Sequence, residues 1–419
     1  VFFDDITFIL VDQASTSENV PFSFNSTNPL GIESTFSNNS TGDYSFSVGI
    51  ANTASGEHSS ALGQEANATG LSSLASGYDT TASGAYSSAF GQSTTASGSH
   101  SSAFGNLSTA TAFTSFSAGS DSHANGAASI ALGSGANAQS DYAVAIGHGA
   151  TTSAESSVAL GYNVTASEVA ATAMGYNTTA SGFYSSAMGE STTASGYVSL
   201  ALGKNTTSSA EQSIAAGYGS IAEGNRSTAL GLYSKASGTS STAMGLHTVS
   251  ESPSSLVIGT WNELNSGDEQ TLFVIGNGGW DATRENYLGT EESRSNALKV
   301  LVDGTTTIAG DLSINSDARL KANIVSLGAT LSKLLQIDGK SYTMKKDKSE
   351  KQKIGLLAQD IEKVFPELVS ESNGIKSVNY QGLVPVLVNA MKEQQRILSE
   401  QQSELDELKS IMKKIIERQ

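Results

Sequence analysis

The 419-residue chain contains no cysteine, only 5 prolines and only 7% aromatic residues. Without cysteine, neither disulfides nor a thiolate metal site can hold the fold together. No run of eighteen apolar residues occurs, so the sequence offers no candidate for a membrane-spanning helix. Lysine and arginine number 23 against 40 acidic residues, and the net charge of −17 argues against a nucleic-acid partner. Few aromatics, and 42 glycines spread along the whole chain, are typical of a fibre and not of an enzyme with a shaped pocket.

The beginning of the chain has neither a methionine nor a basic segment, so Val1-Phe2-Phe3 does not resemble a signal peptide. The first 41 residues start apolar and continue as polar loop. We expect a segment of unknown role: a partner strand, an anchor to a larger virion or surface fibre, or the cut end of a longer fibre.

Residues 42–260 carry a repeat of 14 residues. Sixteen glycines keep this spacing without a break from Gly49 to Gly259. Serine stands four residues before the glycine in 14 of the 16 units and alanine two residues before it in 13, while the residue directly before it is usually apolar. The pattern predicts a β-solenoid whose coils contain two short strands and two tight turns. We expect alternate side chains to point inward and the glycines to serve turns that need positive φ.

Each coil has about one large apolar residue, which is too little to enclose a core of its own. A monomeric solenoid would need more inward-facing bulk per coil. Several chains that share one axis would bury the apolar residues together, so the composition favours an oligomer.

The stretch Ser157-Val158-Ala159-Leu160-Gly161 resembles the head repeat of YadA-type trimeric autotransporter adhesins. The resemblance covers residues 42–260 and implies a homotrimer of left-handed β-rolls. Heads of this family bind host surfaces or matrix proteins. Because the repeat is a scaffold pattern, it leaves the partner open among a cell-surface receptor, a glycan and a matrix ligand.

Residues 261–315 break the period and predict a β-rich neck. Two stretches, 272–276 and 297–304, have the composition of strands, and the second ends in an Asp-Gly turn. We expect Trp280 to belong to the core of this neck.

From residue 316 lysine rises and glycine falls. The motifs SDARLKANI, KIGLLAQDIEKVFPELV and NGIKSVNYQGL follow in order. They resemble the intramolecular chaperone domain of phage endosialidases and tail spikes, a family of self-cleaving peptidases, over residues 316–419. The family uses a Ser-Lys dyad five residues apart, which Ser316 and Lys321 match.

Such a dyad can cut its own chain once. A serine hydroxyl becomes a good nucleophile when a base removes its proton, and a neutral lysine can be that base. Attack by Ser316 on the carbonyl of Asn315 would cleave the Asn315–Ser316 bond. Spacing alone also fits another role, in which Ser316 is a helix N-cap with Asp317 in the first turn.

The last helix shows five heptads. Positions a and d are mostly apolar, which predicts a coiled coil; the other interpretation is one amphipathic helix packed on its own domain. Position a holds Val384, Met391, Leu398, Leu405 and Met412, and position d holds Leu387, Gln394, Gln401, Leu408 and Ile415.

These features predict a trimeric extracellular fibre or adhesin, either a phage tail fibre or a bacterial surface fibre. The C-terminal domain would assist trimerisation and then release itself. The alternative is a structural repeat fibre, or one that binds ice or another surface, with an uncleaved C-terminal trimerisation cap, since threonine pairs such as Thr80-Thr81 recur in the repeat. No cofactor, metal site or multi-turnover activity is expected, because no phosphate loop or zinc motif has the right context and the histidines are scattered. The histidines are His58, His100, His123, His148 and His247.

Overall fold

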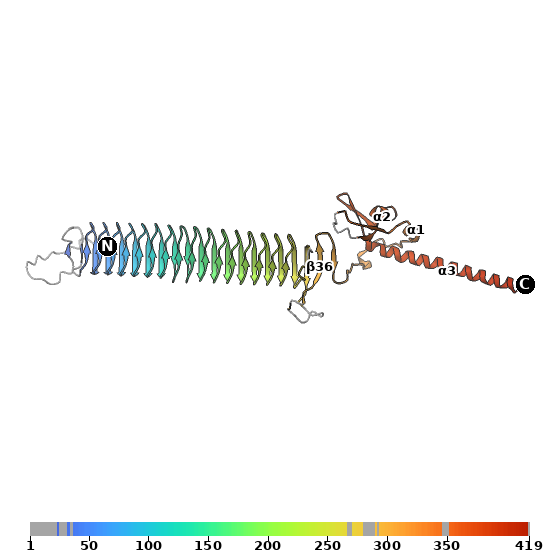
Figure 1. Cartoon of the computed structure of the whole chain (residues 1–419), viewed down its shortest axis with the longest axis horizontal. Coiled ribbons are helices and arrows are strands. Elements are labelled where there is room, and N and C mark those ends of the chain that lie inside the picture. The colour runs from blue at the N-terminus through green and yellow to red at the C-terminus, as the bar shows by residue number, and fades with distance from the viewer. Residues whose placement is uncertain are drawn as a thin grey trace, which may run out of the picture. The chain divides into compact units, whose positions relative to one another are not determined.

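A computed structural model describes residues 23–24, 32–33, 37–265, 270–279, 290, 293–345 and 352–417. The chain divides into two compact units, Val1–Asp311 and Leu312–Gln419, each of which can be followed in Figure 1. Most of the N-terminal segment, and Trp280 in the neck, lie outside the described residues.

The first unit is a β-solenoid in which every coil has a long strand followed by a short one. The long strands stack in parallel within a 21-stranded sheet and the short ones form a parallel 16-stranded sheet. Stacking preserves the repeat, so that Leu160 on one coil pairs with Met174 on the next. The predicted mainly β solenoid with two strands per coil is therefore confirmed.

The long strands are β4 (Phe46–Ile50), β6 (Ser60–Gln64), β8 (Leu74–Tyr78), β10 (Ser88–Gln92), β12 (Ser102–Asn106), β14 (Phe116–Ser120), β16 (Ile130–Leu132), β18 (Val144–Ile146), β20 (Val158–Tyr162), β22 (Thr172–Tyr176), β24 (Ser186–Glu190), β26 (Leu200–Lys204), β28 (Ile214–Tyr218), β30 (Thr228–Leu232), β32 (Thr242–Leu246) and β34 (Leu256–Thr260). The short strands are β3 (Asn39–Ser40), β5 (Thr53–Ala54), β7 (Asn67–Ala68), β9 (Thr81–Ala82), β11 (Thr95–Ala96), β13 (Thr109–Ala110), β15 (His123–Ala124), β17 (Asn137–Ala138), β19 (Thr151–Thr152), β21 (Thr165–Ala166), β23 (Thr179–Ala180), β25 (Thr193–Ala194), β27 (Thr207–Ser208), β29 (Ile221–Ala222), β31 (Lys235–Ala236) and β33 (Val249–Ser250). Before them lie β1 (Ser23–Phe24) and β2 (Ile32–Glu33).

The interior of the solenoid is filled by small side chains. Alanines from both sheets, such as Ala159 and Ala166, are fully buried, and the serine four residues before the repeat glycine, such as Ser157, is buried beside them. The large apolar residue before the glycine points the other way, and Leu160 is only half-buried. A single chain thus has an interior of its own, made of small residues, and its bulky apolar side chains lie outside that interior.

Fourteen of the sixteen repeat glycines lie within the long strands and not in the turns, which corrects the predicted role, while Gly133 and Gly147 directly follow β16 and β18. Gly161 is the fourth residue of β20 and has φ +136°. A β-carbon built on it would stand 2.0 Å from the carbonyl oxygen of Gly175 on the next coil. The left-handed turn positions are taken by other residues, for example His58 (φ 57°), Asn163 (φ 50°) and Tyr184 (φ 58°).

The solenoid ends in a small sheet region that contains the predicted neck strands. After β34 come β35 (Thr271–Asn277), paired in parallel, and then β36 (Asn296–Leu301) and β37 (Thr306–Ile308), each paired antiparallel. Trp261 is nearly buried here, because His247 stacks on it at 4.0 Å and Arg294 lies 5.0 Å over its ring.

The second unit is a small α+β domain that ends in a long helix. Its core joins Ile361, Phe365 and Val386, and the hydroxyl of Thr330 donates to the carbonyl of Val386 at 2.9 Å. No described helix is long and apolar enough to span a membrane. The elements are η2 (Ala318–Leu320), α1 (Leu331–Leu334), β38 (Lys340–Tyr342), β39 (Lys353–Gly355), α2 (Ala358–Val364), η3 (Pro366–Leu368), β40 (Val369–Ser372), β41 (Ile375–Val378), η4 (Tyr380–Gly382) and α3 (Leu383–Ile416).

Candidate functional site

Ser316 and Lys321 meet at the start of the second unit. Lys321 Nζ donates a hydrogen bond to Ser316 Oγ at 2.7 Å. The 3-10 turn η2 lies between them, and Lys321 ends it by donating its backbone N–H to the carbonyl of Ala318. This single turn brings together two residues that are five apart in sequence, and both are exposed in the single chain.

Asp317, and not Ser316, caps this turn. Its carboxylate accepts from the backbone N–H of Arg319 at 2.8 Å and pairs with the Arg319 guanidinium at 2.6 Å. The side-chain bond from Arg319 and then its backbone bond hold the pKa of Asp317 below its ordinary value. The N-cap role considered for Ser316 is therefore wrong, and its hydroxyl faces the lysine amine instead.

The geometry around Ser316 suits an intramolecular acyl transfer. A hydroxyl next to an amine at hydrogen-bond distance is the arrangement of a nucleophile and its base. The carbonyl carbon of Asn315 belongs to the peptide bond that precedes Ser316, so the reacting carbonyl needs no binding pocket. The sequence had found both residues; the structure adds their contact.

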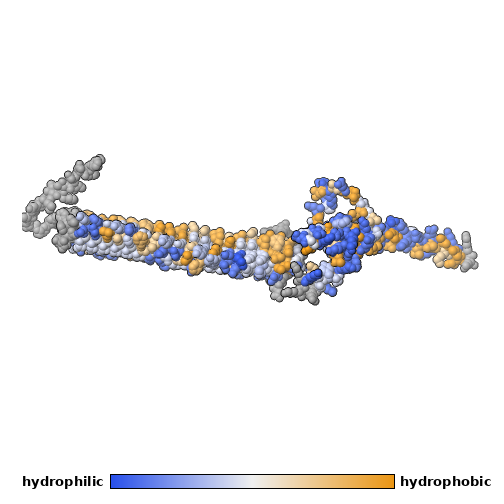
Figure 2. Space-filling model, turned by 90° about the horizontal axis from the view of Figure 1, so that it is seen from above, coloured by the Kyte–Doolittle hydropathy of each residue, from blue (hydrophilic) through white to orange (hydrophobic). Residues whose placement is uncertain are grey.

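A second candidate site is the outer face of the long-strand sheet. We call the residues directly before the repeat glycines the near column and the residues three before them the far column. Both columns alternate with the buried alanines, so they point outward, and none of their residues is charged. Hydrophobic residues gather along one edge of the solenoid in Figure 2. In an acidic chain, such a face is one that another copy can approach without charge repulsion.

The helix α3 offers a third uncovered surface. Near its start Leu383, Val386 and Ala390 are buried against the domain. Farther along, the predicted seam stays exposed in the single chain, as the exposed fractions of Leu398 (51%) and Leu405 (47%) indicate.

Exposed rings stack on one another at strand ends and turns of the solenoid, a feature that the sequence analysis missed. His148, Tyr162 and Tyr176 follow one another on successive coils, with ring centroids 4.8 and 5.2 Å apart. At the opposite turn Tyr86 stacks on His100 at 4.9 Å. Aligning the tyrosines and histidines at 14-residue spacing would have found these stacks.

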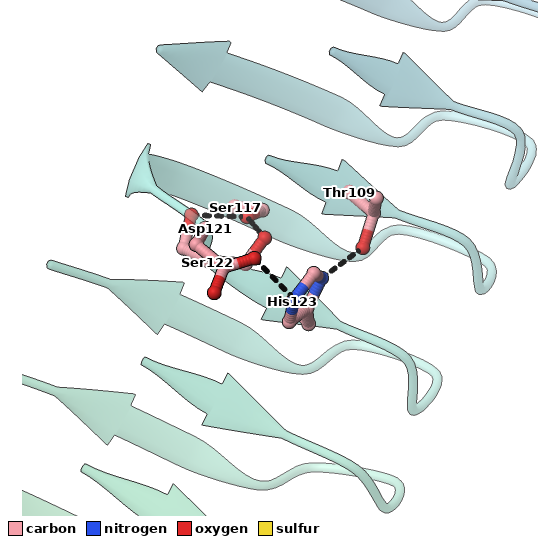
Figure 3. Close-up of polar contacts among 5 residues, drawn as sticks. All are labelled: Thr109, Ser117, Asp121, Ser122 and His123. Atoms are coloured by element: carbon pink, nitrogen blue, oxygen red, sulfur yellow. Dashed lines mark hydrogen bonds and ion pairs between the residues drawn. The ribbon is translucent and has the colours of Figure 1, made fainter. Parts of the chain in front are cut away.

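A polar cluster on β13 to β15 has the order of a carboxylate, an imidazole and a hydroxyl (Figure 3). His123 contacts Asp121 Oδ1 through Nε2 at 3.1 Å and Thr109 Oγ1 through Nδ1 at 2.7 Å. The backbone N–H groups of Thr109 and Thr111 are already bonded to the next coil, so they cannot hold an oxyanion. The buried hydroxyls of Ser117 and Ser122 pair at 2.7 Å within their coil. We interpret the cluster as a set of hydrogen bonds that stabilises the stacking of neighbouring coils.

The fold defines a β-solenoid protein with a second, α+β unit. The chain matches the YadA head domain repeat and, at residues 316–370, the family described as chaperone of endosialidase. Both resemblances predicted from the motifs are thereby confirmed. The head-repeat matches cover residues 40–66, 68–94, 82–108, 138–163, 166–189, 180–206, 194–220, 208–234 and 222–248.

Two phage proteins are similar to this chain. Long tail fiber protein Gp37 of Salmonella phage S16 is 28% identical over 164 residues, which are 36% of this chain and 22% of that protein. Long tail fiber protein Gp37 of Escherichia phage AR1 is 28% identical over 145 residues, 32% of this chain and 13% of that protein. The chain thus spans less than a quarter of the length of these relatives.

Proposed function

We propose that this chain is part of a homotrimeric adhesive fibre on the outside of a phage virion. The head repeats, the similarity to two tail fibre proteins and the uncharged outer face of the solenoid support this proposal. Residues 42–260 form the fibre, residues 261–315 its neck, and residues 316–419 a chaperone domain that aligns three chains through α3. The receptor is a surface component of the host cell.

The chaperone domain releases itself after assembly by cutting the Asn315–Ser316 bond. The contact of 2.7 Å between Lys321 Nζ and Ser316 Oγ is the observation that carries this step. Once Lys321 Nζ has given up a proton to water, it can accept the hydroxyl proton while Ser316 Oγ attacks the carbonyl carbon of Asn315. The C–N bond breaks, the proton passes to the departing amine of Ser316, and an ester remains. Water then hydrolyses the ester, leaving a carboxylate on Asn315 and a free hydroxyl on Ser316.

Removing the domain would make assembly irreversible. Three solenoids that associate along their length can be displaced by whole coils, so they misassemble easily without help. Once the aligning domain has gone, the solenoid persists because its unfolding is slow.

The test is the intact mass of the full chain beside Ser316→Ala, with native mass for the oligomeric state. The wild type should give a trimeric fragment that ends at Asn315, and Ser316→Ala a full-length trimer. Ser313→Ala, which removes a nearby hydroxyl, should cut normally. Cleavage in Ser316→Ala, or none in the wild type, would refute the autoproteolysis; a monomeric mass would refute the fibre.

A further inference from the structure

The bulky residues of the outer face do not follow the 14-residue period. Where the near column has a small residue, the far column of the same coil has a large one, as for Ser76 with Leu74 and Ala118 with Phe116. The same holds at Ala216, whose far-column partner is Ile214.

The converse also holds along the face. Aromatic or methionine residues in the near column stand in the same coil as serine or threonine in the far column. These pairs are Phe90 with Ser88, Phe104 with Ser102, Met174 with Thr172, Met188 with Ser186, and Met244 with Thr242.

The apolar ridge therefore changes column along residues 74–118. Phe90 and Phe104 stack in the near column with ring centroids 5.1 Å apart and an interplanar angle of 2°. The next ring is Phe116 of the far column, 5.8 Å from Phe104. Leu74 precedes this group in the far column. A ridge that crosses from one column to the other and back is a pattern that a shift by one coil cannot reproduce.

We propose that this zigzag sets the axial register of the chains in the trimer, an inference that rests on the proposed homotrimer. The contacts of a threefold assembly are heterologous, so one column of a copy faces the other column of the next copy. In register, each large near-column residue then meets a small far-column residue of its neighbour. The occupant of the face is a second copy of this chain, level with the first.

A shift by one coil destroys this fit in either direction. Displaced one way, Phe104 would face Phe116 and Ser76 would face Ser88, giving an overpacked contact beside an empty one. Displaced the other way, Phe90 would face Leu74 and Ser76 would face Ser60. One slipped chain alters two of the three contacts between chains in the trimer, so the cost in packing energy arises twice.

The zigzag is needed because many other coils do not distinguish the correct axial register from one that is shifted by a coil. Coils such as those of Ile130 with Leu132 and Val158 with Leu160 are large in both columns. Neighbouring coils of this kind can exchange partners with little change in volume. The register information therefore lies where the large residues change column, along residues 74–118 and again at Ala216 with Ile214.

Disulfide trapping in the full-length chain tests the proposal, because the described chain contains no free cysteine that would interfere. A chain with Leu160→Cys and Val158→Cys forms disulfides between neighbouring chains that stand at the same level. A chain with Leu160→Cys and Thr172→Cys forms them between chains shifted by one coil, which is about 4.8 Å along the axis. Covalent species between chains are measured on non-reducing gels of the purified native trimer. We expect the same-level product to be at least about tenfold more abundant, equivalent to about 1.4 kcal/mol in favour of the correct register.

The decisive comparison is a variant of unchanged composition, L74S/S76L/F116A/A118F/I214A/A216I, which we call the levelled variant. In the five coils of residues 60–118, and in the coil of residues 214–216, all large residues then stand in the near column, so large still faces small but the zigzag is gone. We expect it to remain trimeric and to form the one-coil product as readily as the same-level product. The control I130L/L132I exchanges residues where both columns are large and should behave as wild type.

Each outcome decides. Strict same-level crosslinking in the levelled variant would overturn the register proposal while leaving the trimer intact. A monomeric wild type would instead remove the proposed function on which the inference rests. If the levelled variant does not assemble, L74S/S76L and F116A/A118F each remove one column change, and in both the proportion of one-coil product should rise above that of the wild type; an unchanged proportion in both would contradict the proposal.

Discussion

The carbonyl oxygen of Gly175 lies 2.0 Å from the place that a β-carbon on Gly161 would occupy. The same relationship joins Gly147 to Gly161 on the previous coil, at 1.9 Å. Glycine recurs every 14 residues because stacked backbones approach too closely for any side chain. The positive φ at this strand position adds a second reason.

Gly161→Ala should therefore destabilise the solenoid. Backbone strain alone is expected to cost about 1–3 kcal/mol, and the clash with Gly175 adds to it. Urea unfolding followed by far-UV circular dichroism measures the change. Gly310→Ala is the matched control, since nothing lies within 4 Å of its β-carbon position and its φ is ordinary; an equal loss there would contradict the explanation.

Lys321→Arg and Lys321→Met should both abolish cleavage. Arginine keeps the positive charge and the donor to Ser316, but it does not lose its proton and cannot serve as a base. Time-resolved intact mass at fixed temperature gives the cleavage rate. If Lys321→Arg cut at the wild-type rate, Lys321 would be a positioning residue and not the base.

Arg319→Ala should raise the pKa of Asp317. In the native chain the Arg319 side chain, and then its backbone N–H, keep that pKa low. Because the folded pKa lies below the unfolded one, this contribution to stability is present above the unfolded pKa and disappears as the pH falls through the folded pKa. An NMR titration of the Asp317 carboxyl should show the difference between the two proteins.

The exposed seam of α3 should carry the association of the chaperone domain. Leu398→Glu together with Leu405→Glu places two carboxylates in the seam. Burying each carboxylate is expected to destabilise the trimer by about 2 kcal/mol or more. Native mass should show loss of the trimer in the Ser316→Ala background, where the domain stays attached. Ser403→Glu, off the seam, should leave the trimer intact. If the double variant assembled into trimers as efficiently as its Ser316→Ala parent, the seam of α3 would not carry the association.

Much of the architecture could be read from the spacing of residues. The 14-residue glycine period, with serine and alanine at fixed offsets, was enough to predict the solenoid, its two strands per coil and its inward rows, because local alternation decides which way a strand residue points. The pair Ser316 and Lys321 was also found from sequence, through the motifs around it.

Other features depend on which parts of the chain lie next to each other in the folded protein. The place of Gly161 inside a strand, rather than in a turn, follows from the approach of Gly175 and not from any local preference. The choice of Asp317 over Ser316 as the cap follows from which side chain reaches the N–H of Arg319. Neither can be decided from one-dimensional spacing.

The amino-acid sequence by itself thus determined the repeat, the division into a solenoid and a chaperone-like end, and the candidate dyad, since all of these are periodic or local patterns. Only the tertiary structure showed that small residues fill the interior while Phe90, Phe104 and Phe116 form a ridge outside it. The reason is physical: the coil is too narrow for large side chains, so where the bulk goes depends on the width between two sheets, a distance that exists only in the folded chain.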